Sequence, residues 1–160
     1  MFKIFYSRKL RTNDILTSAL YCERTFYRAF LKDIKNSKQQ ILIESPFITI
    51  KRTKVLLPAL RKASNRGVKI QINTRNPKHH CKEMEVQAWR SIKALRRSGV
   101  KVKIYNDMRH RKISVIDKKV LWEGSLNILS QSNSKELMRR TSSETMARQL
   151  LRIVKYSLEV

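Results

Sequence analysis

The sequence contains few of the residues that interrupt or cross-link a chain. Its 160 residues include only 3 Gly and 3 Pro, which argues against long disordered linkers. It has two cysteines, Cys22 and Cys81, which we expect to be reduced thiols in a reducing compartment. No apolar run approaches the roughly 20 residues that span a bilayer, and Met1–Leu20 is too often interrupted by charges to be a signal peptide. We therefore expect a single cytoplasmic domain over residues 1–160, with residues 1–20 as a possible N-terminal extension.

Negative charge is also scarce. The chain has 12 Asp and Glu against 36 Lys and Arg, which gives a net charge of +24. A field of this size attracts polyanions, and the excess has one sign along the whole chain. Nucleic acid is the first partner that this charge predicts, and an anionic membrane surface, without stable insertion, is the second. Charge alone would fit a protein that only binds.

Hydrophobic residues recur at helix and strand spacings along most of the chain. A tight turn at Asp117-Lys118 should join two strands into a hairpin, and Thr141-Ser142-Ser143-Glu144 has the form of a capping box that opens a last helix ending at residue 158. Strands that alternate with helices, followed by a hairpin, predict an α/β sandwich with a mixed β-sheet flanked by helices. The other helices are expected over residues 23–36, 52–65 and 83–98, and the strands over residues 2–6, 40–44, 68–73, 100–105, 112–116, 119–122 and 136–140.

Four side chains within residues 110–127 could converge on one phosphate. Residues i and i+2 of a strand share a face, so His110 and Lys112 should point the same way, and so should Ser125 and Asn127. Lys112 offers a positive charge, and Ser125 and Asn127 offer hydrogen-bond donors to the non-bridging oxygens. His110 is the one with nucleophilic and acid–base capacity near neutral pH. The pattern predicts a site that breaks a phosphodiester.

Three carboxylates compete for a role beside these residues. Asp117 lies at an odd offset from His110 and should face away from the phosphate, so we assign it a turn or salt-bridge role. A nucleophilic imidazole needs an acceptor at its second nitrogen, and Glu136 is the best candidate. Glu144 is the rival, but its place in the capping box explains it without catalysis. No metal and no cofactor are expected.

A second His-x-Lys occurs at His80-Cys81-Lys82. Gln87 stands where an aspartate would be expected, and no Gly-Ser-x-Asn follows. His79, His80 and Cys81 could suggest a zinc site, but adjacent residues rarely chelate one ion well. We interpret this segment as a basic loop beside the substrate.

The pattern H-x-K-x4-D of His110, Lys112 and Asp117, with Gly124-Ser125-Leu126-Asn127 after it, resembles the HKD motif of the phospholipase D superfamily. Residues 41–48, ILIESPFI, followed by residues 66–70, RGVKI, resemble the first half of a phospholipase D-like domain. Residues 121–127, LWEGSLN, resemble the variant found in compact nucleases and in nuclease domains attached to helicases. The resemblance covers nearly the whole chain.

This resemblance implies a mechanism without metal or cofactor. In the family, two histidines face each other; one attacks phosphorus to form a phosphohistidine and the other protonates the leaving oxygen. A chain with one motif supplies both as a homodimer. Each half-site would contain His110, Lys112, Ser125, Asn127 and Glu136, with Asp117 and Gly124 as structural positions of the motif. Arg111 departs from the family pattern and is expected to add positive charge near the scissile group.

Three functions fit the sequence to different degrees. The first is a nuclease that hydrolyses nucleic acid, with DNA as the first substrate and RNA as the second, and with a helicase or other nucleic-acid-processing protein as a candidate partner. The alternative is a phospholipase D-type lipid phosphodiesterase, against which stand the +24 charge and the small domain. A non-catalytic nucleic-acid-binding module is third, because binding alone would not require Lys112, Ser125 and Asn127 beside His110.

Overall fold

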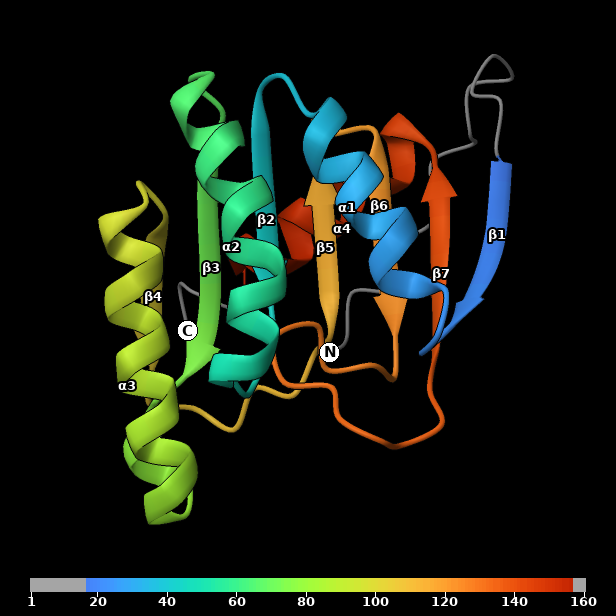
Figure 1. The fold of residues 1–160 in the computed structure, drawn as a ribbon. Coiled ribbons are helices and arrows are strands. Elements are labelled where there is room, and N and C mark those ends of the chain that lie inside the picture. The colour runs from blue at the N-terminus through green and yellow to red at the C-terminus, as the bar shows by residue number, and fades with distance from the viewer. Residues whose placement is uncertain (1–16, 157–160) are drawn as a thin grey trace, which may run out of the picture.

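A computed structural model describes residues 17–156, with side chains for residues 17–154. Its centre is a seven-stranded mixed sheet in the order β1-β7-β6-β5-β2-β3-β4. Helices α1, α2 and α3 cover one face of this sheet, and α4 packs on the other (Figure 1). This arrangement confirms the predicted α/β fold.

The helices are α1 (Phe26–Asn36), α2 (Ile50–Asn65), the short 3-10 helix η1 (Pro77–His79), α3 (Lys82–Arg97) and α4 (Glu144–Tyr156). The strands are β1 (Thr17–Cys22), β2 (Gln40–Glu44), β3 (Lys69–Arg75), β4 (Lys101–Tyr105), β5 (Ile113–Ile116), β6 (Val120–Gly124) and β7 (Leu137–Ser142).

Strand β2 supplies both hydrophobic cores. Successive side chains of a strand point to opposite faces, so Ile41 and Ile43 join the core under α1, α2 and α3, while Leu42 packs with Ala147 and Val154 of α4. A strand buried on both faces needs an uninterrupted apolar run. Residues 41–43, ILI, form that run, and the structure confirms the predicted strand over Gln40–Glu44.

Aromatic packing fixes α1 on the sheet. Phe26, Phe30 and Ile34 recur at helical spacing and are fully buried. The Trp122 ring of β6 lies 5.2 Å from the Phe26 ring and 5.8 Å from the Phe30 ring, both edge to face, the geometry that aromatic pairs prefer. This packing holds β6, and the residues that follow it, in a fixed place.

The turn between β5 and β6 is tied to the start of β2. Asp117 and Lys118 both have positive φ, 53° and 57°, as the tight turns of hairpins require. The Asp117 carboxylate accepts backbone N–H groups of Lys38, Gln39 and Gln40 at 2.8, 2.8 and 3.0 Å. These hydrogen bonds therefore hold the β5–β6 turn against the start of β2, at one end of the central strands.

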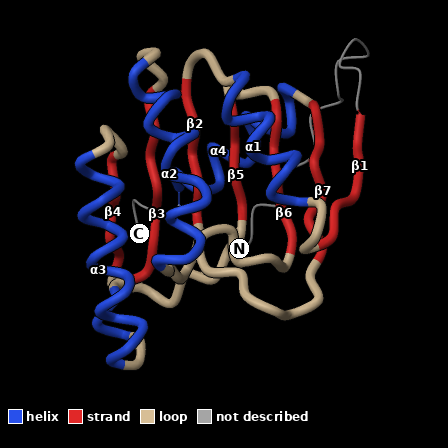
Figure 2. Tube along the Cα trace, viewed as in Figure 1, coloured by secondary structure: helices blue, strands red, loops and turns tan. Residues whose placement is uncertain are grey.

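The loops that carry the motif residues lie at the opposite end of these strands. The segments after β2 and β6 and before β5 and β7 gather there (Figure 2). Within residues 17–156, no helix is long and apolar enough to cross a membrane.

Several predicted boundaries were wrong. Strand β1 was not predicted; it pairs antiparallel with β7, and its first residues fall in the segment considered as an extension. The predicted strand over residues 2–6 lies outside the described residues. Thr141 and Ser142 belong to β7 because they pair with Leu121 and Val120 of β6. Ser143 is the residue before α4, and its Oγ accepts the Met146 N–H at 3.2 Å, so the cap is a single serine.

Candidate active site

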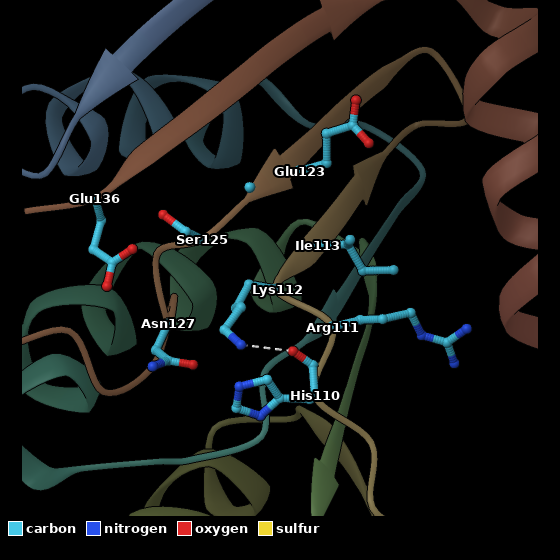
Figure 3. Close-up of a pocket in the computed structure, with 9 residues that line it drawn as sticks. His110, Arg111, Lys112, Ile113, Glu123, Ser125, Asn127 and Glu136 are labelled. Carbon is cyan, nitrogen blue, oxygen red and sulfur yellow. Dashed lines mark hydrogen bonds between the residues drawn. The ribbon is translucent and has the colours of Figure 1, made fainter.

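A cavity of about 480 Å³ opens at the end of the central strands where the motif residues lie. Its lining comes from the loop before β5, the end of β6 and the segment before β7 (Figure 3). The lining residues are His110, Arg111, Lys112, Ile113, Glu123, Gly124, Ser125, Asn127 and Glu136. The structure thus brings together the five side chains expected in one half-site. Asp117 lies at the other end of β5, in the turn.

His110 and Lys112 precede β5 rather than forming part of it. Lys112 Nζ donates a hydrogen bond to the His110 carbonyl oxygen at 2.7 Å. The imidazole of His110 is exposed, whereas Lys112 is half-buried. Burial lowers the pKa of Lys112 below its ordinary value, and the negative charge of Glu136 opposes this change. The ammonium group is thus close to His110 and only partly hydrated.

The Gly-Ser-x-Asn segment is held against the start of β7. A Cβ atom on Gly124 would lie 2.2 Å from the Leu137 carbonyl oxygen, so a side chain cannot fit there. The Ser125 N–H donates to the same carbonyl at 3.0 Å, and Ser125 Oγ accepts the Leu137 N–H at 3.2 Å. This close approach places the Ser125 hydroxyl at the pocket surface.

Asn127 begins a turn and keeps part of its amide free. Its backbone carbonyl accepts the N–H groups of Ser130 and Gln131 at 3.0 and 2.8 Å. Its Oδ1 is buried without a hydrogen-bond partner among the described residues. Buried polar atoms are normally satisfied. Because Oδ1 is an acceptor, the part of the amide that can bind a phosphate oxygen is the Nδ2 donor.

Glu136 lies across the pocket from His110, beyond Asn127 (Figure 3). Among the described residues no hydrogen bond joins Glu136 to His110, and its charge acts on Lys112. Glu144, the rival candidate, is on α4, where its carboxylate accepts from Arg148 Nε at 2.9 Å. Glu136 is therefore the one of the two that belongs to the pocket.

Arg111 has a contact that the sequence did not predict. Its side chain extends away from Lys112 (Figure 3), and its Nε donates to Glu44 Oε1 at 2.7 Å. Arg111 thus lines the cavity, as its expected place near the scissile group requires, but its charge is paired with a buried carboxylate. Glu44 was not predicted as a functional residue, because an acid at the end of an apolar run is equally typical of an exposed strand end. Glu123, which also lines the pocket, had no sequence signal of its own.

The loop with the second His-x-Lys lies near the pocket but does not line it. The His80 ring is 4.8 Å from the Phe47 ring, and Phe47 is 6.1 Å from the His110 ring. Burial lowers the pKa of His80, and the nearby charges of Arg75 and His79 lower it further. Among residues 17–154, no three His, Cys, Asp or Glu side chains are grouped to hold a metal ion.

The mixed sheet and the polar pocket at the ends of its central strands, lined by His110, Lys112 and Asn127, define the α/β architecture of this protein. Residues 30–157 match the family model described as cardiolipin synthase, phospholipase D-like domain. This match covers most of the sequence. The chain belongs to the phospholipase D superfamily, whose members are phosphodiesterases.

Solved structures share the fold at low sequence identity. NucT from Helicobacter pylori superposes with a TM-score of 0.71 at 18% identity, covering 90% of this chain and 96% of that one. Nuc from Salmonella typhimurium, a phospholipase D family member, gives 0.69 at 16% identity over 86% and 90% of the two chains. Phosphatidylserine synthase from Haemophilus influenzae gives 0.65 at 11% identity over 94% of this chain and 39% of that one. No curated protein matches the sequence.

Proposed function

We propose that this protein is a nuclease that hydrolyses nucleic acid, with DNA as its first substrate, through a phosphohistidine in a homodimer. One observation carries the proposal: His110, Lys112 and Asn127 line one open cavity of a chain with net charge +24. The cavity supplies a nucleophile and groups that hold a phosphate, and the charge attracts a polyanion.

The first step transfers the phosphoryl group to the protein. A neutral His110 imidazole attacks phosphorus, and the bond from phosphorus to the leaving oxygen breaks. A second, protonated imidazole gives its proton to that oxygen, which departs as an alcohol. Lys112, Ser125 and Asn127 hold the negative charge that accumulates on the non-bridging oxygens.

The second step releases the product. The second imidazole, now neutral, accepts a proton from water as the water oxygen attacks phosphorus. The phosphorus–nitrogen bond breaks, and both imidazoles return to their starting states. We assign to Glu136 the role of accepting an imidazole N–H, because its carboxylate lines the same cavity.

The second imidazole has to come from another chain. Nucleophile and leaving group lie on opposite sides of phosphorus in an in-line displacement, so one imidazole serves poorly at both. The sequence has 3 histidines, and of these His79 and His80 do not line the cavity. A two-fold contact brings the same patch of two identical subunits together, and the exposed His110 is accessible to it.

Lipid hydrolysis is the second candidate. It is favoured by the family model, described as cardiolipin synthase, and by the likeness to a phosphatidylserine synthase. The same steps would apply, since only the alcohol that leaves would differ. The excess of 36 Lys and Arg over 12 Asp and Glu favours the nucleic acid, which presents many phosphates to one protein surface.

Parallel assays separate these functions. Plasmid DNA, single-stranded DNA, RNA and phosphatidylcholine vesicles are incubated with the wild type and with His110→Ala, each with and without EDTA. We expect cleavage of DNA that survives EDTA, because Lys112 supplies the positive charge, and no cleavage by His110→Ala. Cleavage of lipid alone would favour the second candidate, and DNA binding without any cleavage would indicate a binding module.

A further inference from the structure

His110 sits in a loop that needs an anchor. Strand β4 ends at Tyr105 and β5 begins at Ile113, so the backbone around His110 lies outside the sheet ladder. Loop backbones are generally more mobile than the elements they join. A nucleophile must nevertheless be held within a fraction of an ångström of its reacting position.

One buried carboxylate holds the residues on both sides of His110. Glu44, at the end of β2, has a fully buried side chain. Its Oε1 accepts from Arg111 Nε at 2.7 Å, and its Oε2 accepts from Arg109 Nη1 at 3.4 Å. Because the two arginines flank His110 directly, both ends of this short segment are tied to a strand of the central sheet.

Arg109 is itself fixed by further contacts. Its Nε and Nη2 donate to the two carboxylate oxygens of Asp107 at 2.7 and 2.6 Å. Its guanidinium lies over the Tyr105 ring, 3.4 Å from the ring centroid, and its side chain is only 3% exposed. Two acids and two arginines thus compensate one another where unpaired charge would be costly. The cluster is rigid because each charged group has a defined partner.

We propose that Glu44 is a positioning residue for His110. Its carboxylate clamps Arg109 and Arg111 and so aims the imidazole between them into the cavity. The catalytic part of this inference rests on the proposed function, whereas the mechanical part can be measured without any substrate.

The chain offers a matched control. Asp33 of α1 pairs with Arg140 of β7 at 2.8 Å and accepts from Trp122 Nε1 at 2.9 Å. This partly buried carboxylate also joins an arginine to the fold, but neither Asp33 nor Arg140 lines the cavity. Glu44→Gln and Asp33→Asn each remove one negative charge and keep the size of the side chain.

The experiment measures kcat and KM on DNA together with amide hydrogen exchange and the thermal unfolding midpoint. Both variants should unfold at a lower temperature than the wild type. Glu44→Gln alone should lower kcat, by about tenfold or more, with KM within about twofold, because uniform binding of substrate is kept. The Arg111 and Lys112 amides should exchange faster in Glu44→Gln and at the wild-type rate in Asp33→Asn. Glu44→Asp, which keeps the charge on a shorter stem, should recover part of kcat.

Equal losses of kcat in Glu44→Gln and Asp33→Asn, or unchanged exchange at Arg111 and Lys112, would overturn the positioning role. Should Glu44→Gln fail to fold, Arg111→Gln replaces it, since it breaks one arm of the clamp and keeps the contact between Glu44 and Arg109. That variant should lower kcat and speed exchange at Lys112, and a wild-type kcat there would equally defeat the proposal. If the wild type cleaves no substrate, the proposed function fails while the exchange rates still decide whether Glu44 holds the loop.

Discussion

Lys112 is a cation held half-buried at the mouth of an open pocket. Burial lowers the pKa of its ammonium, and the carboxylate of Glu136 raises it. Under the proposed mechanism the ammonium must be charged to hold the phosphate. Activity should therefore fall with rising pH before a fully hydrated lysine would lose its proton.

Removing the negative charge of Glu136 should move the fall of activity at high pH to a lower pH. Glu136→Gln deletes the contribution that raises the Lys112 pKa, so the pKa falls further and the alkaline limb of kcat/KM shifts toward neutral pH. The measurement is a pH–rate profile of the variant against the wild type. Glu144→Gln is the control, because Glu144 pairs with Arg148 on α4. A limb that stays in place in Glu136→Gln would mean that another group controls it.

For individual residues, the sequence predicted which side chains meet in the cavity, but not which contacts hold them there. Residue spacing grouped His110, Lys112 and Asn127, and all three line one cavity. Neither residue pair shares a strand face, since His110 and Lys112 precede β5 and Ser125 and Asn127 follow β6. Glu44 could not be recognised, because whether an acid is buried beside two arginines depends on contacts between β2 and a loop distant in sequence.

At the scale of elements, the β5–β6 hairpin is anchored by one carboxylate. Asp117→Ala would remove the acceptor for three backbone N–H groups and place alanine at a positive φ of 53°. Because water can replace part of these bonds at the surface, we expect a loss of about 2–3 kcal/mol in the free energy of unfolding. Urea unfolding measures this loss.

The turn variants should leave the chemistry in place. Asp117 lies at the opposite end of β5 from His110, so kcat of folded Asp117→Ala should stay near the wild-type value. Asp117→Asn, which retains one acceptor oxygen and tolerates positive φ, should lose less stability. A large loss of kcat with unchanged unfolding would show that Asp117 serves the site directly.

Elements with strong periodicity were predicted, and those decided by pairing were not. The apolar stripe of Phe26, Phe30 and Ile34 predicted α1, although the helix begins at Phe26 rather than at residue 23. Strand β1 has mostly exposed residues and exists through its pairing with β7, which no local pattern reveals. The helix over residues 83–98 was displaced by one residue, to Lys82–Arg97.

At the scale of the whole molecule, part of the positive charge lies in a second groove. A hollow of about 890 Å³ is lined by residues of β2, β3 and β4 and by Leu151 and Val154 of α4. Four lysines line it, no acidic side chain does, and none of the four makes an ion pair within the described part of the chain. These lysines are Lys69, Lys101, Lys103 and Lys118. If the chain binds DNA along this face, they neutralise phosphates remote from His110.

Neutralising two of these lysines should weaken DNA binding and its salt dependence. The double variant Lys101→Gln with Lys103→Gln should lower the magnitude of the slope of log affinity against log salt concentration by up to about two. This holds for single-stranded and for double-stranded DNA. The control pair, Lys51→Gln with Lys54→Gln, removes the same charge from α2 on the other face. Titrations at several salt concentrations compare the two doubles. Identical slopes in both would mean that the groove binds no DNA.

The proposed homodimer predicts that inactive chains have a dominant effect on activity. Wild type is mixed with excess His110→Ala under conditions that allow subunit exchange. Mixed dimers hold one nucleophile or one acid but not both, so activity should fall below that expected from dilution. Activity proportional to the wild-type chain, or a monomer by light scattering at the assay concentration, would contradict the dimer.

The sequence predicted the fold class and the superfamily, and both are confirmed. The dimer and the nucleic-acid substrate stay predictions. Both depend on how an outer surface complements another molecule, and the spacing of His110, Lys112 and Asp117 in one chain carries no information on that.

Under the proposed mechanism, His110 becomes covalently bonded to phosphorus while DNA is cleaved. The most direct test is to mix protein and DNA in EDTA, quench under denaturing conditions, and search by mass spectrometry for a nucleotide adduct on the peptide that contains His110. The wild type should carry the adduct on His110 while DNA is cut, and His110→Ala should show neither adduct nor cleavage. Cleavage that persists in His110→Ala, or that appears only when a divalent ion is restored, would contradict the account.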